Sequence, residues 1–299
     1  MQRGRAVKEA MATIMTITAG MPRLGKSQLA LNLALELVRR GCWTGLYYEQ
    51  AASSTLDRLV KLPPVVFQER RAEDDIPVDV LRRGYQGVDI IACRIPLSSW
   101  ADTDRARLQR CIGMLDIREG YDELLVDTSG MSAHEALACN LAAGLVVVVV
   151  TPEPDSRAQA FALLRVLLLN GYHGLLRLLV NRVSCAADAG DIQQSFNRRV
   201  HDHLGVDIPL LGFVPEDAQV GLAEQAGQAF STVFPDSEAA SQIVVLADAI
   251  GELEQAELRP LTVSEYWGKV REVLAKPLLL PGGADLDAVL AAGNGPAAG

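Results

Sequence analysis

Eight consecutive residues near the start of the chain have the types and spacing of a phosphate-binding loop that fits the pattern G-x-x-x-x-G-K-[ST]. The run is Gly20-Met21-Pro22-Arg23-Leu24-Gly25-Lys26-Ser27. In such a loop the backbone N–H groups and the positive end of the following helix hold the phosphates of a nucleotide. Lys26 would neutralise the β- and γ-phosphate oxygens, and the Ser27 hydroxyl would bind Mg²⁺.

The residues on either side of this loop favour nucleotide binding over a structural glycine turn. Ile14 to Thr18 is a short apolar run, and residues from Gln28 to Arg40 carry apolar side chains at helical spacing. Strand, loop and helix in this order are the context that the motif requires. The sequence therefore predicts an ATP-binding loop with these contact residues: Gly20, Arg23, Leu24, Gly25, Lys26, Ser27 and Gln28.

Asp127 is the expected partner of this loop. It ends the apolar run from Glu123 to Asp127, which is typical of a Walker B strand whose carboxylate supports Mg²⁺ opposite the loop serine. The alternative is a helix N-cap, because an aspartate after a strand often begins the next helix. The upstream loop favours the magnesium role, so Ser27 and Asp127 are the predicted metal residues.

Short β-branched runs alternate with segments of helical periodicity along most of the chain. The expected strands are Ala12–Ala19, Thr44–Tyr48, Val88–Arg94, Glu123–Thr128, Gly144–Thr151, Leu175–Asn181 and Leu210–Val214. The expected helices lie near 26–40, 102–117, 133–142, 155–170, 188–203, 218–228 and 236–255. This alternation predicts the α/β class, with a doubly wound, mostly parallel sheet that carries helices on both faces. Ligands of such sheets bind beyond the carboxyl ends of the strands.

Composition excludes several classes of function. The chain has 299 residues, of which 49% are hydrophobic and 22% charged, as in a soluble globular protein with one large domain. Its net charge of −9 argues against nucleic acid as a partner. The five cysteines have neither zinc spacing nor C-x-x-C pairs, and no apolar run is long enough to span a bilayer. With no secretory signal, the expected location is the cytoplasm.

The pattern changes after the main domain. We expect a nucleotide-binding domain over residues 1–257, an amphipathic helix within 258–281 and a flexible tail rich in glycine and alanine over 282–299. One face of the helix gathers the large apolar side chains Val263, Tyr266, Trp267, Val270, Val273 and Leu274. Such a helix either lies in a membrane surface or packs on its own domain, and both interpretations fit this pattern.

Several segments together resemble the MinD/ParA group of P-loop ATPases, and within it the FlhG (FleN, YlxH) branch that regulates flagellar number and placement. The similarity spans roughly Thr13 to Gly251. It rests on residues 121–128, on the strand that runs into Thr151-Pro152-Glu153-Pro154, and on residues 179–183 and 212–217. The resemblance implies ATP and Mg²⁺ as cofactors. It also implies adenine contacts from Asn181, Arg182, Pro215 and Asp217.

The same resemblance implies protein partners. In this branch they are an FlhF-type GTPase, a flagellar transcription regulator or a component of the flagellar C-ring. It further implies a nucleotide-dependent homodimer and contact of the helix at 263–280 with the inner face of the cell membrane. The stretch Gln2–Met11 lacks the helix through which some members stimulate the GTPase, which puts that activity in doubt.

The loop departs from the family pattern K-G-G-x-G-K-[ST]. Met21 stands where the family has the lysine that reaches the partner's nucleotide, and Pro22 and Arg23 replace two glycines. Methionine brings no charge to a γ-phosphate. Arg23 either clamps a phosphate in place of that lysine or is simply solvated, and the sequence does not choose between these roles.

A second departure follows the strand at Thr44–Tyr48. Tyr48 and Gln50 occupy the two positions of a family Asp-x-Asp that positions water and the magnesium shell. Glu49 and Gln50 are the candidate catalytic residues, but strand alternation directs Glu49 away from Tyr48 and Gln50. Gln50 could orient a water without taking its proton. The segment after Asp127 also looks one residue shorter than the family's switch.

The sequence therefore keeps the residues that bind ATP but lacks those that relatives use to hydrolyse it. Lys26, Ser27 and the loop backbone suffice for binding, whereas the residues that relatives use for cleavage are replaced. We expect an ATP-binding, FlhG-like regulator with weak or absent hydrolysis. The alternatives are an active ATPase of the same group in another positioning role or in cellulose synthesis, and an interaction module with a vestigial loop.

Overall fold

The computed structural model describes residues 11–50, 54–61, 80–93, 96–100, 120–253 and 255–281. The helix expected near 102–117 and the tail expected over 282–299 lie outside the described residues. So does most of the N-terminal stretch Gln2–Met11.

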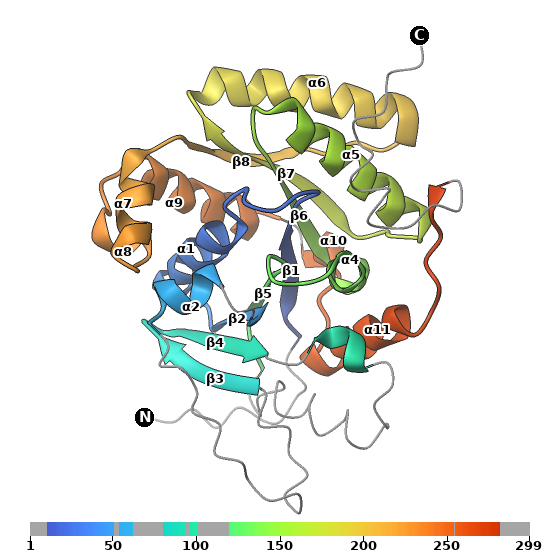
Figure 1. Ribbon diagram of the computed structural model, residues 1–299, viewed down its shortest axis with the longest axis horizontal. Helices are drawn as coiled ribbons and strands as arrows, with labels where there is room; N and C mark the ends of the chain where they lie inside the picture. The colour runs from blue at the N-terminus through green and yellow to red at the C-terminus, as the bar shows by residue number, and fades with distance from the viewer. Residues whose placement is uncertain are drawn as a thin grey trace, which may run out of the picture.

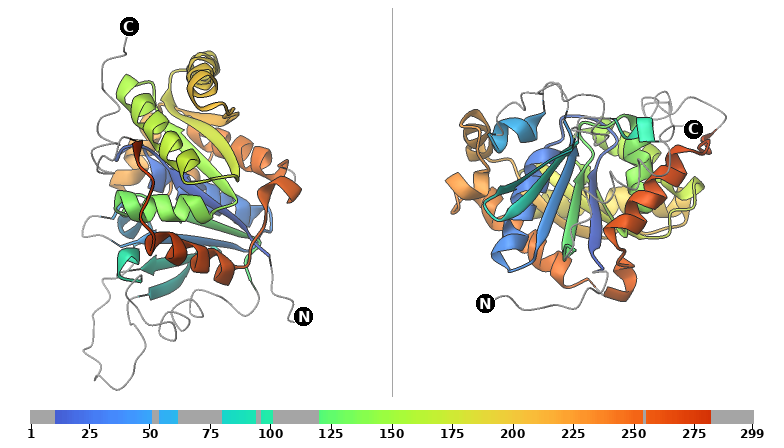
Figure 2. Two further views of the ribbon diagram at one scale, coloured as in Figure 1. Left: turned by 90° about the vertical axis from the view of Figure 1, so that its right-hand side faces the viewer. Right: turned by 90° about the horizontal axis from the view of Figure 1, so that it is seen from below.

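Within the described residues, eight strands form one sheet in the order β3-β4-β2-β5-β1-β6-β7-β8, shown in Figures 1 and 2. All neighbouring strands are parallel except β3 and β4, which form an antiparallel pair. The expectation of a doubly wound, mostly parallel sheet is confirmed, whereas β3 is a strand that the sequence analysis missed. The strands are β1 (Thr13–Thr18), β2 (Thr44–Glu49), β3 (Val80–Tyr85), β4 (Val88–Cys93), β5 (Glu123–Asp127), β6 (Leu145–Val150), β7 (Leu175–Val183) and β8 (Leu210–Pro215).

Helices cover both faces of the sheet, and each face has its own hydrophobic cluster. One cluster holds side chains of α1 (Lys26–Arg39), α2 (Thr55–Leu59), α7 (Ala218–Gln225), α8 (Phe230–Val233) and α9 (Glu238–Gly251). The other holds side chains of the 3₁₀ helix η1 (Leu97–Trp100), α4 (Ala133–Ala142), α5 (Pro154–Leu169), α6 (Ala186–Leu204) and α11 (Val263–Leu274). The short α10 (Gln255–Leu258) precedes α11.

The centre of the sheet positions the phosphate-binding loop. Strand β1 lies between β5 and β6, and its residues are all buried, as are those of β6. Because parallel strands end at the same edge, the loop after β1 and the turn after β5 meet there. Helix α1 starts directly from the loop at Lys26 and is buried along most of its length.

Helix α11 packs on the domain rather than standing apart from it. Its apolar side chains join the cluster on the α4 face, and Trp267 is only 1% exposed. The Trp267 ring lies 4.5 Å from that of Tyr47 on β2, and the Tyr266 hydroxyl donates to the Cys139 carbonyl of α4 at 3.3 Å. Thr262 and Glu265 form a capping box that begins the helix. Of the two interpretations of this helix, the structure adopts the packed one.

In the part of the chain that the structure describes, every helix is too short or too polar to cross a bilayer.

The packing of α11 predicts a large loss of stability when Trp267 is truncated. Trp267→Ala should lower the free energy of unfolding by about 3–5 kcal/mol, because it leaves a cavity between the sheet and α4. Urea denaturation of the full chain measures this change. Lys269→Ala, on the exposed face of the same helix, should change it by less than about 0.5 kcal/mol. If both variants unfold like the parent, α11 does not belong to the cooperative core.

Candidate functional site

The phosphate-binding loop depends on glycine at two close approaches. A Cβ atom on Gly20 would lie 2.2 Å from the backbone carbon of Gln159, so α5 lies directly against the start of the loop. Gly25 has φ of +87°, and a Cβ there would lie 2.6 Å from the Asn181 amide nitrogen. These contacts hold the loop between β7 and α5, and a side chain larger than glycine at either position would disturb its shape.

Two arginines around the loop adopt the left-handed backbone conformation. Arg23 has φ of 64° and Arg182 has φ of 58°. Such conformations cost a non-glycine residue on the order of 1 kcal/mol and cluster at functional sites. The sequence resemblance implies a glycine at the position of Arg23, and glycine is the residue that favours this backbone conformation. The irregularity at Arg182 coincides with a register shift in the pairing of β7 with β8.

Lys26 is buried at the base of the loop. It is 6% exposed, and its ammonium group donates to the Met21 carbonyl at 3.2 Å. Burial lowers the pKa of Lys26, and the nearby Asp127 carboxylate partly opposes that shift. The loop thus folds back over its own lysine, and the Met21 carbonyl holds the Lys26 ammonium group.

Asp127 connects β5 to the loop through a set of short hydrogen bonds. The Ser27 hydroxyl donates to Oδ2 at 2.6 Å, and the backbone N–H and hydroxyl of Ser129 donate to Oδ1 at 3.0 and 2.6 Å. Burial raises the pKa of Asp127, against the effect of these donors and of Lys26. The helix N-cap interpretation of Asp127 is wrong, because α4 is capped by Ser132.

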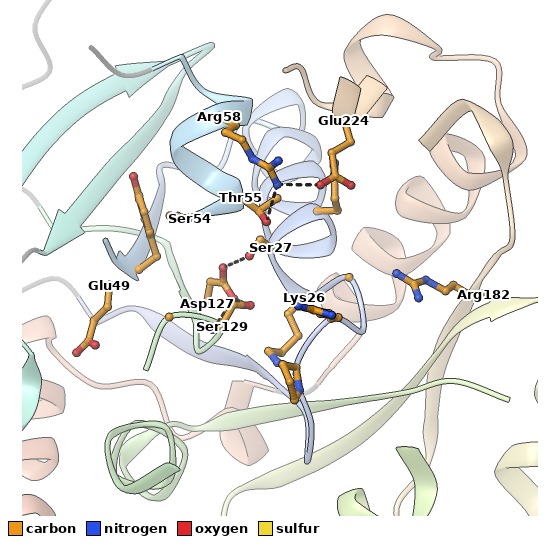
Figure 3. A pocket seen from close by; sticks show the side chains of 16 residues that line it. Lys26, Ser27, Glu49, Ser54, Thr55, Arg58, Asp127, Ser129, Arg182 and Glu224 are labelled. Carbon is orange, nitrogen blue, oxygen red and sulfur yellow. Dashed lines mark hydrogen bonds and ion pairs between the residues drawn. The ribbon is translucent and has the colours of Figure 1, made fainter. Parts of the chain in front are cut away.

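A cavity of about 740 Å³ opens over these residues, and we call it the loop cavity. Figure 3 shows Lys26, Ser27 and Asp127 at its base and Arg58 and Glu224 on its opposite wall. Its volume lies within the usual range for a small-molecule site. The remaining lining residues are Pro22, Arg23, Gly25, Gln28, Tyr48, Glu49, Ser54, Thr55, Ser129, Gly130 and Arg182.

A smaller cavity of about 180 Å³ adjoins the first and shares Gly25, Gln28, Arg182 and Glu224 with it. We call it the side cavity. All four residues expected at an adenine, Asn181, Arg182, Pro215 and Asp217, line it. They come from β7, from the end of β8 and from the N-cap of α7, so the fold brings together segments that the sequence analysis had linked only by resemblance.

Two of these four side chains already have partners. The Asn181 amide donates to the Leu24 carbonyl at 2.8 Å, which ties β7 to the loop. The Asp217 carboxylate caps α7 through the Gln219 N–H at 2.8 Å and accepts from the Ala239 N–H of α9 at 3.2 Å. Both residues therefore shape the side cavity in addition to lining it.

The candidate catalytic residues Glu49 and Gln50 are not arranged as a pair that could position a water at the base of the loop cavity. The Glu49 carboxylate accepts the Leu97 N–H at 2.9 Å and points away from Lys26 (Figure 3). Tyr48 faces the α1 side of the sheet, where its hydroxyl donates to the Asp57 carboxylate of α2. The Gln50 N–H donates to the Cys93 carbonyl at 2.7 Å, and Gln50 is outside the lining of the loop cavity.

Glu49 is held in an environment that favours its neutral form. Burial raises its pKa to about 8, the Glu135 carboxylate adds to the increase, and the Leu97 N–H opposes it. A general base must be ionised to accept a proton, and at neutral pH most Glu49 side chains are protonated. The residue is thus poorly prepared to activate a water.

The donors at the base of the loop cavity fit Mg²⁺ bound together with a nucleotide. A hydroxyl and a carboxylate lie 2.6 Å apart there, and hard oxygen ligands of this kind suit Mg²⁺, which keeps several waters and phosphate oxygens. Among the residues described, histidine, cysteine and acidic side chains nowhere gather in threes as a metal site of their own. The ion would therefore depend on phosphate for the rest of its ligands.

Arg58, Glu224, Ser54 and Thr55 line the loop cavity without having been expected there. Arg58 and Glu224 lie 166 positions apart in the sequence, and neither belongs to a recognisable motif. Only the fold, which places α2 and α7 on the walls of one cavity, brings them together.

Comparisons with known proteins agree with this geometry. The chain is 27% identical over 245 residues to the antiactivator FleN of Pseudomonas aeruginosa, which covers 79% of this chain and 85% of that protein. It is 26% identical over 253 residues to an uncharacterised ATP-binding protein of Methanocaldococcus jannaschii, covering 83% and 92%. No protein-family model matches the chain.

Solved structures show the same fold. The septum site-determining protein MinD of Pyrococcus horikoshii, complexed with Mg-ADP, superimposes with a TM-score of 0.57 at 18% identity, over 83% of this chain and 99% of that one. A ParA family ATPase of Chlorobium tepidum gives 0.56 at 17% identity, over 80% and 98%. These matches cover between 85% and 99% of each relative's length, so the likeness extends over most of each chain.

The environment of Glu49 predicts a pH dependence of stability. Its pKa rises from an ordinary 4.5 to about 8 on folding, so the folded state holds a proton that the unfolded state releases between these values. This stabilising contribution is complete below about pH 4.5 and is lost as the pH rises through about 8. Glu49→Gln should therefore raise the free energy of unfolding at pH 8.5 by on the order of 4 kcal/mol more than at pH 4.5.

Chemical denaturation at the two pH values measures this difference, and Glu252→Gln at an exposed position is the matched control. An equal effect of Glu49→Gln at both pH values would contradict the assignment.

Proposed function

We propose that this chain, which has the fold of the MinD/ParA-type P-loop ATPases and resembles FleN in sequence, binds ATP with Mg²⁺ and regulates protein partners. The loop cavity would hold the phosphates and the side cavity the adenine. The branch that it resembles controls flagellar number and placement, and we assign that role to this chain through nucleotide-dependent partner binding in the cytoplasm.

One observation carries the nucleotide-binding part of this proposal. The Ser27 hydroxyl and the Asp127 carboxylate lie 2.6 Å apart, next to the buried Lys26 and beneath the loop cavity. Ser27 lies in the first turn of α1 and Asp127 ends β5. A glycine turn with only a structural role would need neither residue. Their burial keeps water away and makes charge interactions with a ligand stronger than at the surface.

The chain's own residues would divide the work of binding. Lys26 and the loop N–H groups would hold phosphate oxygens, Ser27 would bind the metal, and Asp127 would support it from behind. Asn181, Arg182, Pro215 and Asp217 would surround the base. Mg²⁺, when bound, supplies positive charge that offsets the phosphates and orients them.

The same residues support weak or absent hydrolysis. Relatives use charge from a partner lysine and a carboxylate pair, and here Met21, Tyr48 and Gln50 stand at those positions. The remaining carboxylate, Glu49, bonds to Leu97 and has a pKa raised to about 8. ATP binding and ATP hydrolysis depend on different residues, and this chain keeps the residues needed for binding.

Regulation through partners is supported by the relatives. FleN is described as an antiactivator, and a MinC:MinD complex of Aquifex aeolicus has the same fold as this chain, with a TM-score of 0.55 at 18% identity. We therefore propose protein partners and a nucleotide-dependent homodimer, with an FlhF-type GTPase, a flagellar transcription regulator or a C-ring component as the candidates. Attachment of the helix at 263–280 to a membrane would require α11 to leave its packed position.

Nucleotide binding predicts a rise in thermal stability. ATP or ADP with Mg²⁺ at about 100 times Kd should stabilise the parent by about 2.7 kcal/mol through mass action. Lys26→Ala should remove most of this gain, and Asp127→Asn should remove its dependence on Mg²⁺. Differential scanning fluorimetry measures the shift, with Lys269→Ala as the control. A parent that does not respond to either nucleotide would show that the loop is vestigial.

Slow turnover is the second expectation. Each lost charge or proton-transfer contribution commonly costs about 10²–10⁴-fold in rate, so phosphate release should be at least about 100-fold slower than that of a MinD relative assayed in parallel. Lys26→Ala supplies the background from contaminating enzymes. Turnover equal to that of the relative, and abolished in Lys26→Ala, would contradict weak hydrolysis.

A further inference from the structure

An ion pair crosses the mouth of the loop cavity. The Arg58 guanidinium of α2 donates to Oε1 of Glu224 on α7 at 3.1 Å, and both side chains line the cavity (Figure 3). They are 61% and 40% exposed, so the pair is accessible from solvent and worth little to stability. A weak pair at the entrance can be exchanged for a better partner.

Helix α2 holds the base of Arg58 in place. Leu56 and Leu59 are fully buried in the hydrophobic cluster around α1, and Asp57 accepts the hydroxyl of Tyr48. Arg58 lies between these anchors on the side of α2 that faces the cavity. The backbone is therefore fixed, while the charged end of the side chain has only exposed partners, the Glu224 carboxylate and the Thr55 hydroxyl at 3.5 Å.

The arginine belongs to the phosphate half of the site. It lines the loop cavity with Lys26, Ser27 and Asp127, and it does not line the side cavity where the expected adenine contacts lie. Glu224 lines both cavities, at the boundary between them. A nucleotide that filled both would bring its phosphates toward Arg58 and its middle toward Glu224.

The charge balance favours an anionic ligand, although the whole chain has a net charge of −9. Four cationic side chains line the loop cavity against three carboxyl groups, of which Glu49 is mostly neutral at pH 7. The cations are Arg23, Lys26, Arg58 and Arg182, and the carboxyl groups are Glu49, Asp127 and Glu224. A polyphosphate carries more charge than the Glu224 carboxylate, so it is the stronger partner for a guanidinium.

We propose that Arg58 is a phosphate ligand that Glu224 holds in reserve at the cavity mouth until a nucleoside triphosphate displaces the carboxylate. Arg58 then supplies, from within the same chain, positive charge that Met21 cannot supply. This inference rests on the proposed function and assigns a further binding residue to the same site. It makes Glu224 a competitor of the nucleotide and Arg58 a specificity residue for triphosphate over diphosphate.

Substitutions of the two residues should act in opposite directions. Arg58→Gln should weaken ATP binding about tenfold and ADP binding by less than about threefold, because the triphosphate carries the greater charge. Glu224→Gln should tighten ATP binding about threefold, because it releases Arg58. Arg58→Lys, which keeps the charge but loses the forked geometry, should be intermediate. Titration calorimetry of the full chain with Mg-ATP and Mg-ADP measures these affinities.

A double-mutant cycle separates release of Arg58 from a general charge effect. In the Arg58→Gln background, Glu224→Gln should no longer change ATP affinity. Arg165→Gln and Asp248→Asn are the matched controls, since neither residue lines the loop cavity. Thermal unfolding without nucleotide establishes that each variant is folded.

Three results would overturn the inference alone, given a parent that binds ATP. Arg58→Gln could leave the affinity unchanged. Glu224→Gln could weaken ATP binding as Arg58→Gln does, which would make the pair a lid over the nucleotide. The effect of Glu224→Gln could also be equal in both backgrounds, which would make it a general charge effect. A parent that binds neither nucleotide would overturn the proposed function as well.

Discussion

The hydrogen bond between Ser27 and Asp127 is the contact on which the site depends, because it joins two neighbouring strands of the sheet at their carboxyl ends. Ser27 begins the helix after β1 and Asp127 ends β5, and these strands pair directly. The bond can form only if the parallel register and the loop are both correct. Burial of the pair, with Lys26 beside it, sets the electrostatics of the cavity above, because it places a cation and a carboxylate where water has little access. These are the groups on which the proposed binding of phosphate and metal rests.

Some parts of the molecule hold this contact in place, and others form the walls of the cavity above it. Gly20 against α5, and Asn181 on the Leu24 carbonyl, fix the loop from two sides. Around that fixed base, the walls are made by α2, by the turn after β5 and by α7, which carry Arg58, Ser129 and Glu224. The strong, buried interactions lie at the base, and the weak, exposed pair lies at the mouth. This division is consistent with the proposed role, in which exposed groups at the mouth exchange partners while the buried base stays unchanged.

Local patterns in the sequence were enough for the base of the site and for most of the sheet. The loop motif, the apolar run that ends at Asp127 and the valine-rich run of β6 each carry their signal within a few residues. Tertiary features left no such signal. Strand β3 contains two arginines and a glycine in its VLRRGY run, so it lacks the apolar alternation of a strand. Arg58 and Glu224 meet only because α2 and α7 flank one cavity. The N-cap of α4 was also not predicted, because Asp127 at the end of β5 is a common type of cap residue, whereas the structure uses Ser132.

The bond from Tyr48 to Asp57 has a consequence for any attempt to rebuild this wall of the site. The phenol links β2 to α2, at a position where the sequence resemblance implies an aspartate. Tyr48→Asp would remove that link and place a second carboxylate near Asp57, with repulsion in place of a hydrogen bond. An aspartate at position 48 would therefore need a compensating change at position 57. Position 48 thus has a structural constraint as well as a place in the lining of the loop cavity.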